Sequence, residues 1–101
     1  MDLEKANNLF IELEAYLKEY GNNSILNSYR IVKSTVHILT SNEDDESKEK
    51  VVIENYKKLF FNKGGLSEFY VWDNDFETRK KINMPLKEIC NELWGLVKDC
   101  I

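Results

Sequence analysis

The sequence has few of the residues that metal sites and disulfide scaffolds require. It contains one histidine, His37, and two cysteines, Cys90 and Cys100, among 101 residues. A structural zinc site takes about four Cys, His or carboxylate ligands at close spacing, and neither CxxC nor HxxxH occurs. The cysteines fall ten residues apart in one predicted helix, about 15 Å along its axis, which is too far for a disulfide within that helix. We therefore expect reduced thiols, and neither a metal nor a cofactor.

Long apolar runs and an excess of basic charge are also missing. No apolar run approaches the roughly 18 residues that span a bilayer, and the N-terminus, acidic from Asp2, lacks the apolar core of a signal peptide. The net charge is −4, whereas binding to phosphate backbones needs a clustered basic surface. These absences predict a cytoplasmic protein that binds neither nucleic acid nor membrane directly.

The length and composition are those of one ordinary globular domain. Domains usually contain about 50 to 250 residues, so residues 1–101 are expected to form a single unit. Apolar residues make up 43% of the chain and charged residues 32%, which excludes a disordered composition.

Helical periodicity covers most of the chain. Apolar residues recur at intervals of three and four over residues 2–20, over residues 25–39, from the polar stretch 40–46 to Phe60, and from about residue 75 to 101. This pattern predicts four amphipathic helices. The expected caps are Asp2 for the first helix, Asn22, Asn23 or Ser24 for the second, Ser41 or Asn42 for the third and Asn74 for the fourth, with Gly21 ending the first helix and the stretch Asn62–Gly65 ending the third.

Two segments depart from this regular pattern. Residues 66–72 are short and aromatic without clean alternation, so we expect an ordered loop or a short extended piece. Pro85 lacks an N–H and should kink or split the last helix near Asn83 and Met84. The predicted fold is an all-α antiparallel bundle of about four helices with a short aromatic loop. A small α+β arrangement, with strands at 31–39 and 66–72, is the alternative.

Motifs for catalysis or ligand binding are weak throughout the chain. Asp73, Asp75 and Glu77 match the first places of a calcium loop, but Thr78 and Met84 occupy the places that require Gly and Glu. The pair Gly64–Gly65 lacks the further glycines of a phosphate-binding loop. A nucleophilic thiol requires a base and an orienting group; Cys90 neighbours Ile89 on the apolar side, and the only imidazole, His37, lies far from both cysteines in the sequence. We therefore expect a protein that is not an enzyme.

Two features are candidates for a binding surface. The first is the aromatic loop, in which Tyr70 and Trp72 are of the residue types most enriched at binding hot spots; such a loop can instead close one end of a bundle. The second is an acidic helix start, which could steer a basic partner but also stabilises its own helix. The residues expected to contact a protein partner are Glu43, Asp44, Asp45, Glu46, Glu68, Tyr70, Trp72, Asp73 and Asp75.

The run from Gly64 to Arg79, GGLSEFYVWDNDFETR, resembles a stretch found in small uncharacterised bacterial proteins. As a short, acidic, cytoplasmic helical protein, the chain also resembles the immunity proteins of bacterial toxin systems, including those of contact-dependent growth inhibition. That resemblance implies a protein that neutralises a cognate toxin, in many such systems a nuclease, by binding it tightly and directly.

Other functions remain open at the level of sequence. A different protein-interaction or regulatory helical module, including a homodimeric bundle, would have the same periodicity. A structural or housekeeping role is a further alternative, and an enzyme would require a pocket that joins Cys90 or Cys100 to His37 and a carboxylate. The oligomeric state and the identity of the partner do not follow from the sequence.

Overall fold

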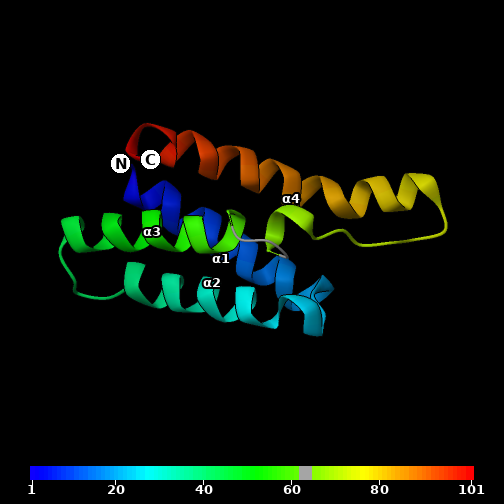
Figure 1. Cartoon of the computed structure of the whole chain (residues 1–101), viewed down its shortest axis with the longest axis horizontal. Coiled ribbons are helices and arrows are strands. Elements are labelled where there is room, and N and C mark those ends of the chain that lie inside the picture. Colours follow the sequence, from blue (N-terminus) through cyan, green and yellow to red (C-terminus); the bar gives the residue numbers. More distant parts are fainter. Residues whose placement is uncertain (62–64) are drawn as a thin grey trace.

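Four α-helices make up the fold in the computed structural model, which describes residues 1–61 and 65–101 (Figure 1). They are α1 (Leu3–Tyr20), α2 (Leu26–Leu39), α3 (Asp45–Phe60) and α4 (Phe76–Val97). Single 3₁₀ turns accompany the helices: η1 (Asn23–Ile25) follows α1, η2 (Leu66–Glu68) is the first part of the aromatic loop, and η3 (Lys98–Cys100) follows α4. The all-α prediction is confirmed. The described residues contain no strand, so the alternative with strands at 31–39 and 66–72 is wrong.

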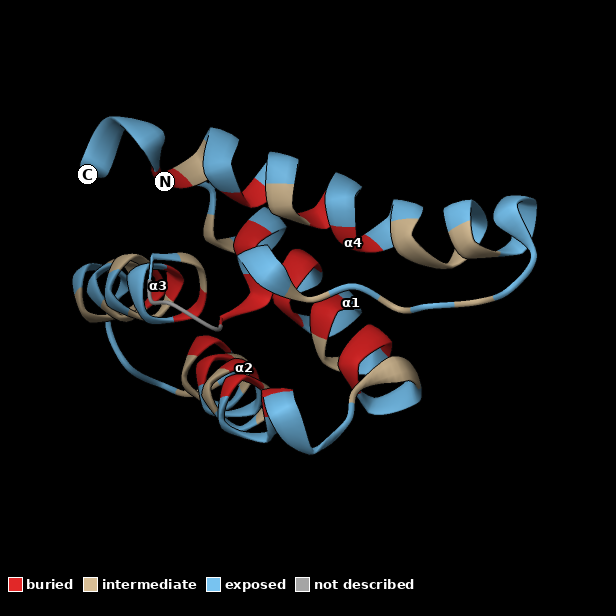
Figure 2. Ribbon diagram, turned by 45° about the vertical axis from the view of Figure 1, so that its right-hand side comes forward, coloured by how far each residue is buried: buried red, intermediate tan, exposed pale blue. Residues whose placement is uncertain are grey.

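The core forms around α1, whose apolar stripe is buried along its whole length. Figure 2 shows the buried positions of all four helices turned toward one another around α1. Helix α1 packs closely against α2 and α4, and α2 packs against α3. Polar contacts add to this: the Tyr16 hydroxyl donates to the Ile82 carbonyl at 3.0 Å, and the Asn55 amide donates to the Thr35 hydroxyl at 2.7 Å. The largest fully buried side chains are Phe10, Leu13, Leu59, Leu66 and Leu93.

Helix α1 begins and ends where the sequence predicted. The Asp2 carboxylate accepts a hydrogen bond from the Lys5 amide, which confirms the expected cap. Gly21 follows the last residue of α1, but in an extended conformation with φ −71°. Glycine is needed there for close approach, since a Cβ at Gly21 would lie 2.3 Å from the Leu17 oxygen and 2.5 Å from Ile25 Cδ1.

The caps of α3 and α4 differ from the prediction in which residue supplies the oxygen. Asp44, rather than Ser41 or Asn42, caps α3 by accepting from the Ser47 amide at 2.7 Å. Asp75, rather than Asn74, caps α4 by accepting from the Thr78 amide at 3.0 Å. The expected residues have other partners: the Ser41 hydroxyl donates back to the Ile38 carbonyl, and the Asn74 side chain accepts from the Trp72 indole. Helix α2 has no side-chain cap; of the three residues expected to cap the second helix, Asn22 instead caps the preceding turn η1 by accepting from the Ser24 amide.

Helix α4 runs unbroken through Pro85, so Pro85 does not split it. Proline cannot donate to the carbonyl of Lys81, four residues earlier. Pro85 and Lys81 are both exposed, so water can satisfy that carbonyl without breaking the helix. Helix α3 ends at Phe60, and the Phe61 amide donates to the Lys57 carbonyl. Of the predicted stop at Asn62–Gly65, residues 62–64 lie outside the described residues, and Gly65 precedes η2 in an extended conformation.

The bundle is open between α3 and α4. These two helices are not packed closely on each other as the neighbouring pairs α1–α2, α2–α3 and α1–α4 are. Figure 2 shows η2 lying in the space between them. Leu66 of η2 is 2% exposed and reaches the common core, and Phe69 packs against that core from the side. The sides of α3 and α4 that face this space therefore remain partly uncovered.

Candidate functional site

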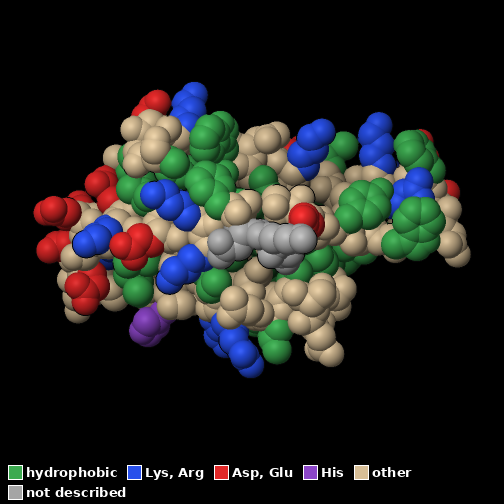
Figure 3. All heavy atoms as spheres, in the orientation of Figure 1, with side chains coloured by type: hydrophobic (Ala, Val, Ile, Leu, Met, Phe, Trp, Pro, Cys, Tyr) green, Lys and Arg blue, Asp and Glu red, His purple; other side chains and the backbone are tan. Residues whose placement is uncertain are grey.

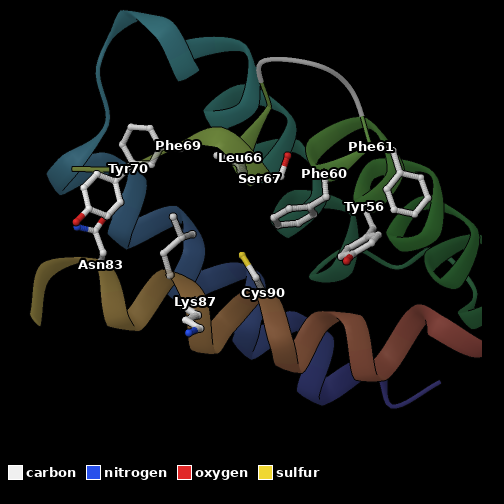
Figure 4. Close-up of a pocket in the computed structure, with 11 residues that line it drawn as sticks. Tyr56, Phe60, Phe61, Leu66, Ser67, Phe69, Tyr70, Asn83, Lys87 and Cys90 are labelled. Carbon is white, nitrogen blue, oxygen red and sulfur yellow. The ribbon is translucent and has the colours of Figure 1, made fainter. Parts of the chain in front are cut away.

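The open side of the bundle forms a groove, which we call the aromatic groove, with a volume of about 490 Å³ (Figure 4). Helix α3 forms one wall, helix α4 the other, and η2 with the following loop closes one end. Most of its lining is apolar. The residues that line it include Tyr56, Phe60 and Phe61 from α3 and its end, Leu66, Phe69 and Tyr70 from the η2 region, and Asn83, Leu86, Lys87 and Cys90 from α4.

The loop that borders the groove is held to α4 by Asn83. The Asn83 side chain accepts from the Val71 amide at 2.9 Å and donates to the Val71 carbonyl at 2.8 Å. The same amide group donates to the Arg79 carbonyl at 2.8 Å, which fixes the orientation of the side chain. Because both backbone groups of Val71 are bound to the helix, the loop cannot fold inward here. The flanking Tyr70 and Trp72 are 56% and 69% exposed.

Arg79 positions the aromatic side chains beyond the groove. Its guanidinium lies 4.3 Å from the centre of the Trp72 ring and 5.4 Å from that of Phe76, within the range of cation–π interactions. It also donates to the Asp73 carbonyl at 3.4 Å. A second hollow of about 350 Å³ lies beside these residues, and Tyr70, Asn83 and Lys87 line both it and the aromatic groove. The two hollows thus form one continuous surface.

Large aromatic side chains are exposed along this surface. Phe61, Phe76 and Trp94 have exposed fractions of 55%, 61% and 45%. Tyr56 connects Trp94 and Phe61 to the core, since its ring stacks on Trp94 with centroids 6.3 Å apart and meets Phe61 edge-on at 5.8 Å. Figure 3 shows hydrophobic side chains in several groups on this face, interspersed with Lys, Arg and other polar side chains. Exposed apolar groups rimmed by polar residues mark interaction sites in soluble proteins.

The predicted acidic cluster lies far from the predicted aromatic anchors. Glu43, Asp44, Asp45 and Glu46 are all exposed at the α2–α3 connection. That connection and the loop with Trp72 lie at opposite ends of the long axis of the molecule, which measures 46 Å (Figure 1). The hydrogen bonds that Asp44 accepts at the start of α3 lower the pKa of its carboxyl. The fold therefore does not combine these acids with Tyr70 and Trp72 into one surface.

The other predicted acids take part in local structure near the loop. The Asp73 carboxylate accepts from the Asp75 amide at 2.8 Å. Asp75 accepts from both the amide and the hydroxyl of Thr78, and these bonds lower the pKa of its carboxyl. Glu68 is exposed on η2 and lines a smaller hollow, which shares Phe69 and Tyr70 with the aromatic groove. Asp73 and Asp75 thus shape the loop and begin α4.

Several residues of this surface were not predicted from the sequence: Phe61, Phe76, Arg79, Lys80, Lys87 and Trp94. A signal for some of them was present. Phe76 and Trp94 are eighteen residues apart, about five helical turns, so they share one face of α4. That face is distinct from the buried stripe through Leu86, Ile89 and Leu93. A second apolar stripe on one helix could therefore have indicated the groove.

Cys90 is the one thiol that lines the groove in the described part of the chain, and burial raises its pKa to about 11. The thiol is therefore protonated at neutral pH and is a weak nucleophile. Neither a histidine nor a carboxylate is among the described residues that line the groove, and His37 is exposed on α2. Both cysteines are free. In residues 1–61 and 65–101, no group of three or more His, Cys, Asp or Glu side chains could hold a metal ion.

Comparisons with protein-family models, with curated proteins and with solved structures found no match to this chain. The helices of the described residues also include none that is long and apolar enough to cross a membrane. The function must therefore be argued from the geometry of the surface itself.

Proposed function

We propose that this chain is a non-enzymatic protein-binding protein, and that its partner occupies the aromatic groove. The observation that carries this proposal is the exposure of Tyr70, Trp72 and Phe76 beside an open apolar groove. Tyrosine and tryptophan supply a large contact area at low entropic cost and dominate binding hot spots. Arg79 holds the Trp72 and Phe76 rings in place before binding, and the Asn83 clamp holds the Val71 backbone between Tyr70 and Trp72, which lowers the cost of ordering this surface.

A macromolecular partner suits this surface better than a small ligand. Sites for small molecules enclose most of the ligand surface and combine apolar walls with convergent polar groups. The aromatic groove is shallow and continues into a second hollow past Tyr70, so it offers length rather than enclosure. An extended partner segment would cover both hollows and bury several aromatic rings at once.

The more specific proposal is an immunity protein that neutralises a cognate bacterial toxin by tight direct binding. The exposed acids of the α2–α3 connection favour it, because such a patch can steer a basic surface, for example that of a nuclease, into contact. In this arrangement, contacts in the aromatic groove stabilise the complex, and the acidic end increases the association rate. The partner must then extend along much of the molecule, since the two features lie at opposite ends of it.

The test is capture of binding proteins from a native lysate, with a co-expressed toxin-like neighbouring gene product where one exists. The wild-type chain is compared with a Tyr70→Ala/Trp72→Ala variant and with an Ile11→Ala/Leu26→Ala control. Ile11 and Leu26 are both 43% exposed on α1 and α2, outside the groove, so the control also truncates two exposed apolar side chains. A partner retained by the wild type and the control but lost from the groove variant supports the proposal. Equal retention by all three chains contradicts it.

A further inference from the structure

We propose that the segment occupying the aromatic groove is an acidic amphipathic helix of the partner protein. This inference rests on the proposed function, namely that the groove binds a protein. It adds the chemistry and the shape of the bound segment, which follow from the charge of the groove rim and from the geometry of α4.

The rim of the groove is basic, although the whole chain carries a net charge of −4. Arg79, Lys80 and Lys87 of α4 line the second hollow, and Lys87 also lines the first. Neither of these two hollows has an acidic residue in its described lining, although Glu68 lines a smaller hollow beside Phe69 and Tyr70. Asp75 lies near Arg79, and the Thr78 hydrogen bonds and the Arg79 charge both lower the pKa of the Asp75 carboxyl, so the proposed charge pairing rests on Lys80 and Lys87. In the described part of the chain, Lys80 and Lys87 form no ion pair, so their charges remain available to a partner.

The acidic residues of α4 do not neutralise this rim, because they lie on another side of the helix. Phe76, Asn83, Lys87 and Trp94 fall within about 40° of one another around the axis at 100° per residue. The helix acids Glu77, Glu88 and Glu92 form a separate stripe, which begins about 80° to 120° farther round than these four residues and about 60° from Lys80. The face of α4 that borders the groove thus combines aromatic and basic side chains.

The geometry favours a helix as the bound element. A strand would need the edge of a sheet to pair with, and the described residues contain no strand. A helix needs an apolar strip with walls on its sides, which α3 and α4 provide along the aromatic groove, while the described residues that line the second hollow come from the loop and α4 alone. From Phe76 to Cys90, the first and last residues of α4 that line the two hollows, this strip extends about 21 Å along α4, the length of about four turns of a partner helix. Binding there would complete the packing that α3 and α4 lack.

Charge also argues against a second copy of this chain in the groove. In a two-fold dimer formed through this surface, the same patch faces itself. With the two-fold axis near Asn83, at the middle of this patch, Arg79 and Lys80 of one copy would lie close to Lys87 of the other, and like charges across an interface oppose association. An acidic partner segment removes this conflict and pairs with the basic rim.

The test is selection of helical peptides from a displayed library against the full chain. Each peptide carries apolar residues at helical positions i, i+4, i+7 and i+11, and each flanking position encodes Glu, Lys, Gln or Ala. The inference expects enrichment of Glu over Lys at the flanks. It also expects that a Lys80→Glu/Lys87→Glu variant weakens the selected peptides at least about tenfold at roughly 150 mM salt.

The control is a Lys33→Glu/Lys81→Glu variant, which changes the net charge by the same amount. Both control lysines are exposed and line neither hollow, and Lys81 is adjacent to Lys80 on α4. Peptides should bind this control within about threefold of the wild type, because screening weakens distant charges. Equal losses in both variants would mean that only net charge matters, which overturns the inference.

Other outcomes separate the two proposals. Enriched peptides that are neutral or basic, and that lose binding to the Tyr70→Ala/Trp72→Ala variant, would overturn the acidic helix and leave groove-mediated protein binding standing. Peptides unaffected by that variant would show that helices bind elsewhere, which also overturns the inference, and lysate capture then decides the proposed function independently. A monomer–dimer equilibrium in sedimentation, abolished by the Tyr70→Ala/Trp72→Ala substitutions, would identify a second copy as the occupant and overturn it as well.

Discussion

Replacing Asn83 by alanine should release the aromatic loop from α4. The Asn83 side chain makes hydrogen bonds of 2.9, 2.8 and 2.8 Å to the Val71 amide, the Val71 carbonyl and the Arg79 carbonyl. At about 1 kcal/mol net for each bond, their loss costs about 3 kcal/mol. Alanine regains roughly 0.6 kcal/mol through its better helix propensity. We therefore expect Asn83→Ala to lower the free energy of unfolding by about 2 kcal/mol.

This expectation has a matched control on the same helix. Asn91 is exposed on α4, and Asn91→Ala should be neutral or raise the stability slightly through helix propensity alone. Urea unfolding followed by circular dichroism measures both variants, and hydrogen exchange of the Val71 amide reports the loop directly. A stability of Asn83→Ala within about 0.5 kcal/mol of that of Asn91→Ala would refute the clamp. Unchanged protection of Val71 would refute it equally.

Three further predictions concern the rest of the molecule. Gly21→Ala should destabilise the fold by about 2 kcal/mol, because the added Cβ would clash with the backbone oxygen of Leu17. Gly95→Ala should instead stabilise α4 by roughly 0.5–1 kcal/mol, because a Cβ there has nothing within 4 Å. Thermal unfolding of the two variants tests this. The Thr78 hydrogen bonds lower the pKa of the Asp75 carboxyl in the folded protein. Its capping contribution to stability is therefore complete above the ordinary pKa of 3.8 and disappears as the pH falls through the folded pKa. Asp75→Asn should retain a cap but lose that part of the pH dependence of stability. Cys90 should react with iodoacetamide much more slowly than the exposed Cys100 at neutral pH, and the rate at Cys90 should keep rising toward pH 11. Peptide mass spectrometry measures both rates. Equal rates for the two cysteines would contradict the burial of Cys90.

The helices could be predicted from the sequence because their signals are local. The apolar stripe from Leu3 to Tyr20 and the Asp2 cap need no information from elsewhere in the chain. The caps of α3 and α4 were misplaced because several side chains with capping oxygens stand side by side there. Ser41 and Asn74 are occupied by the Ile38 carbonyl and the Trp72 indole, and such competition depends on three-dimensional contacts.

The candidate site was only partly predictable, for a reason that lies in packing. Tyr70 and Trp72 were selected by residue type, and they are exposed as a binding role requires. Their neighbours in space come from α4 and from the end of α3, and no local pattern shows that these helices leave a side open. The acidic cluster was selected by charge, but the fold places it at the other end of the molecule from Trp72.

The central claim is that the exposed aromatic side chains of the groove bind a protein and contribute little to folding. Trp72 tests it most directly, since its ring is 69% exposed and contacts mainly Arg79 and Asn74. Binding of the captured partner and unfolding should both be measured for Trp72→Ala. The account predicts a loss of about 2 kcal/mol or more in binding free energy, with a change in stability below about 1 kcal/mol. Unchanged affinity, or a loss of about 3 kcal/mol in stability, would contradict it.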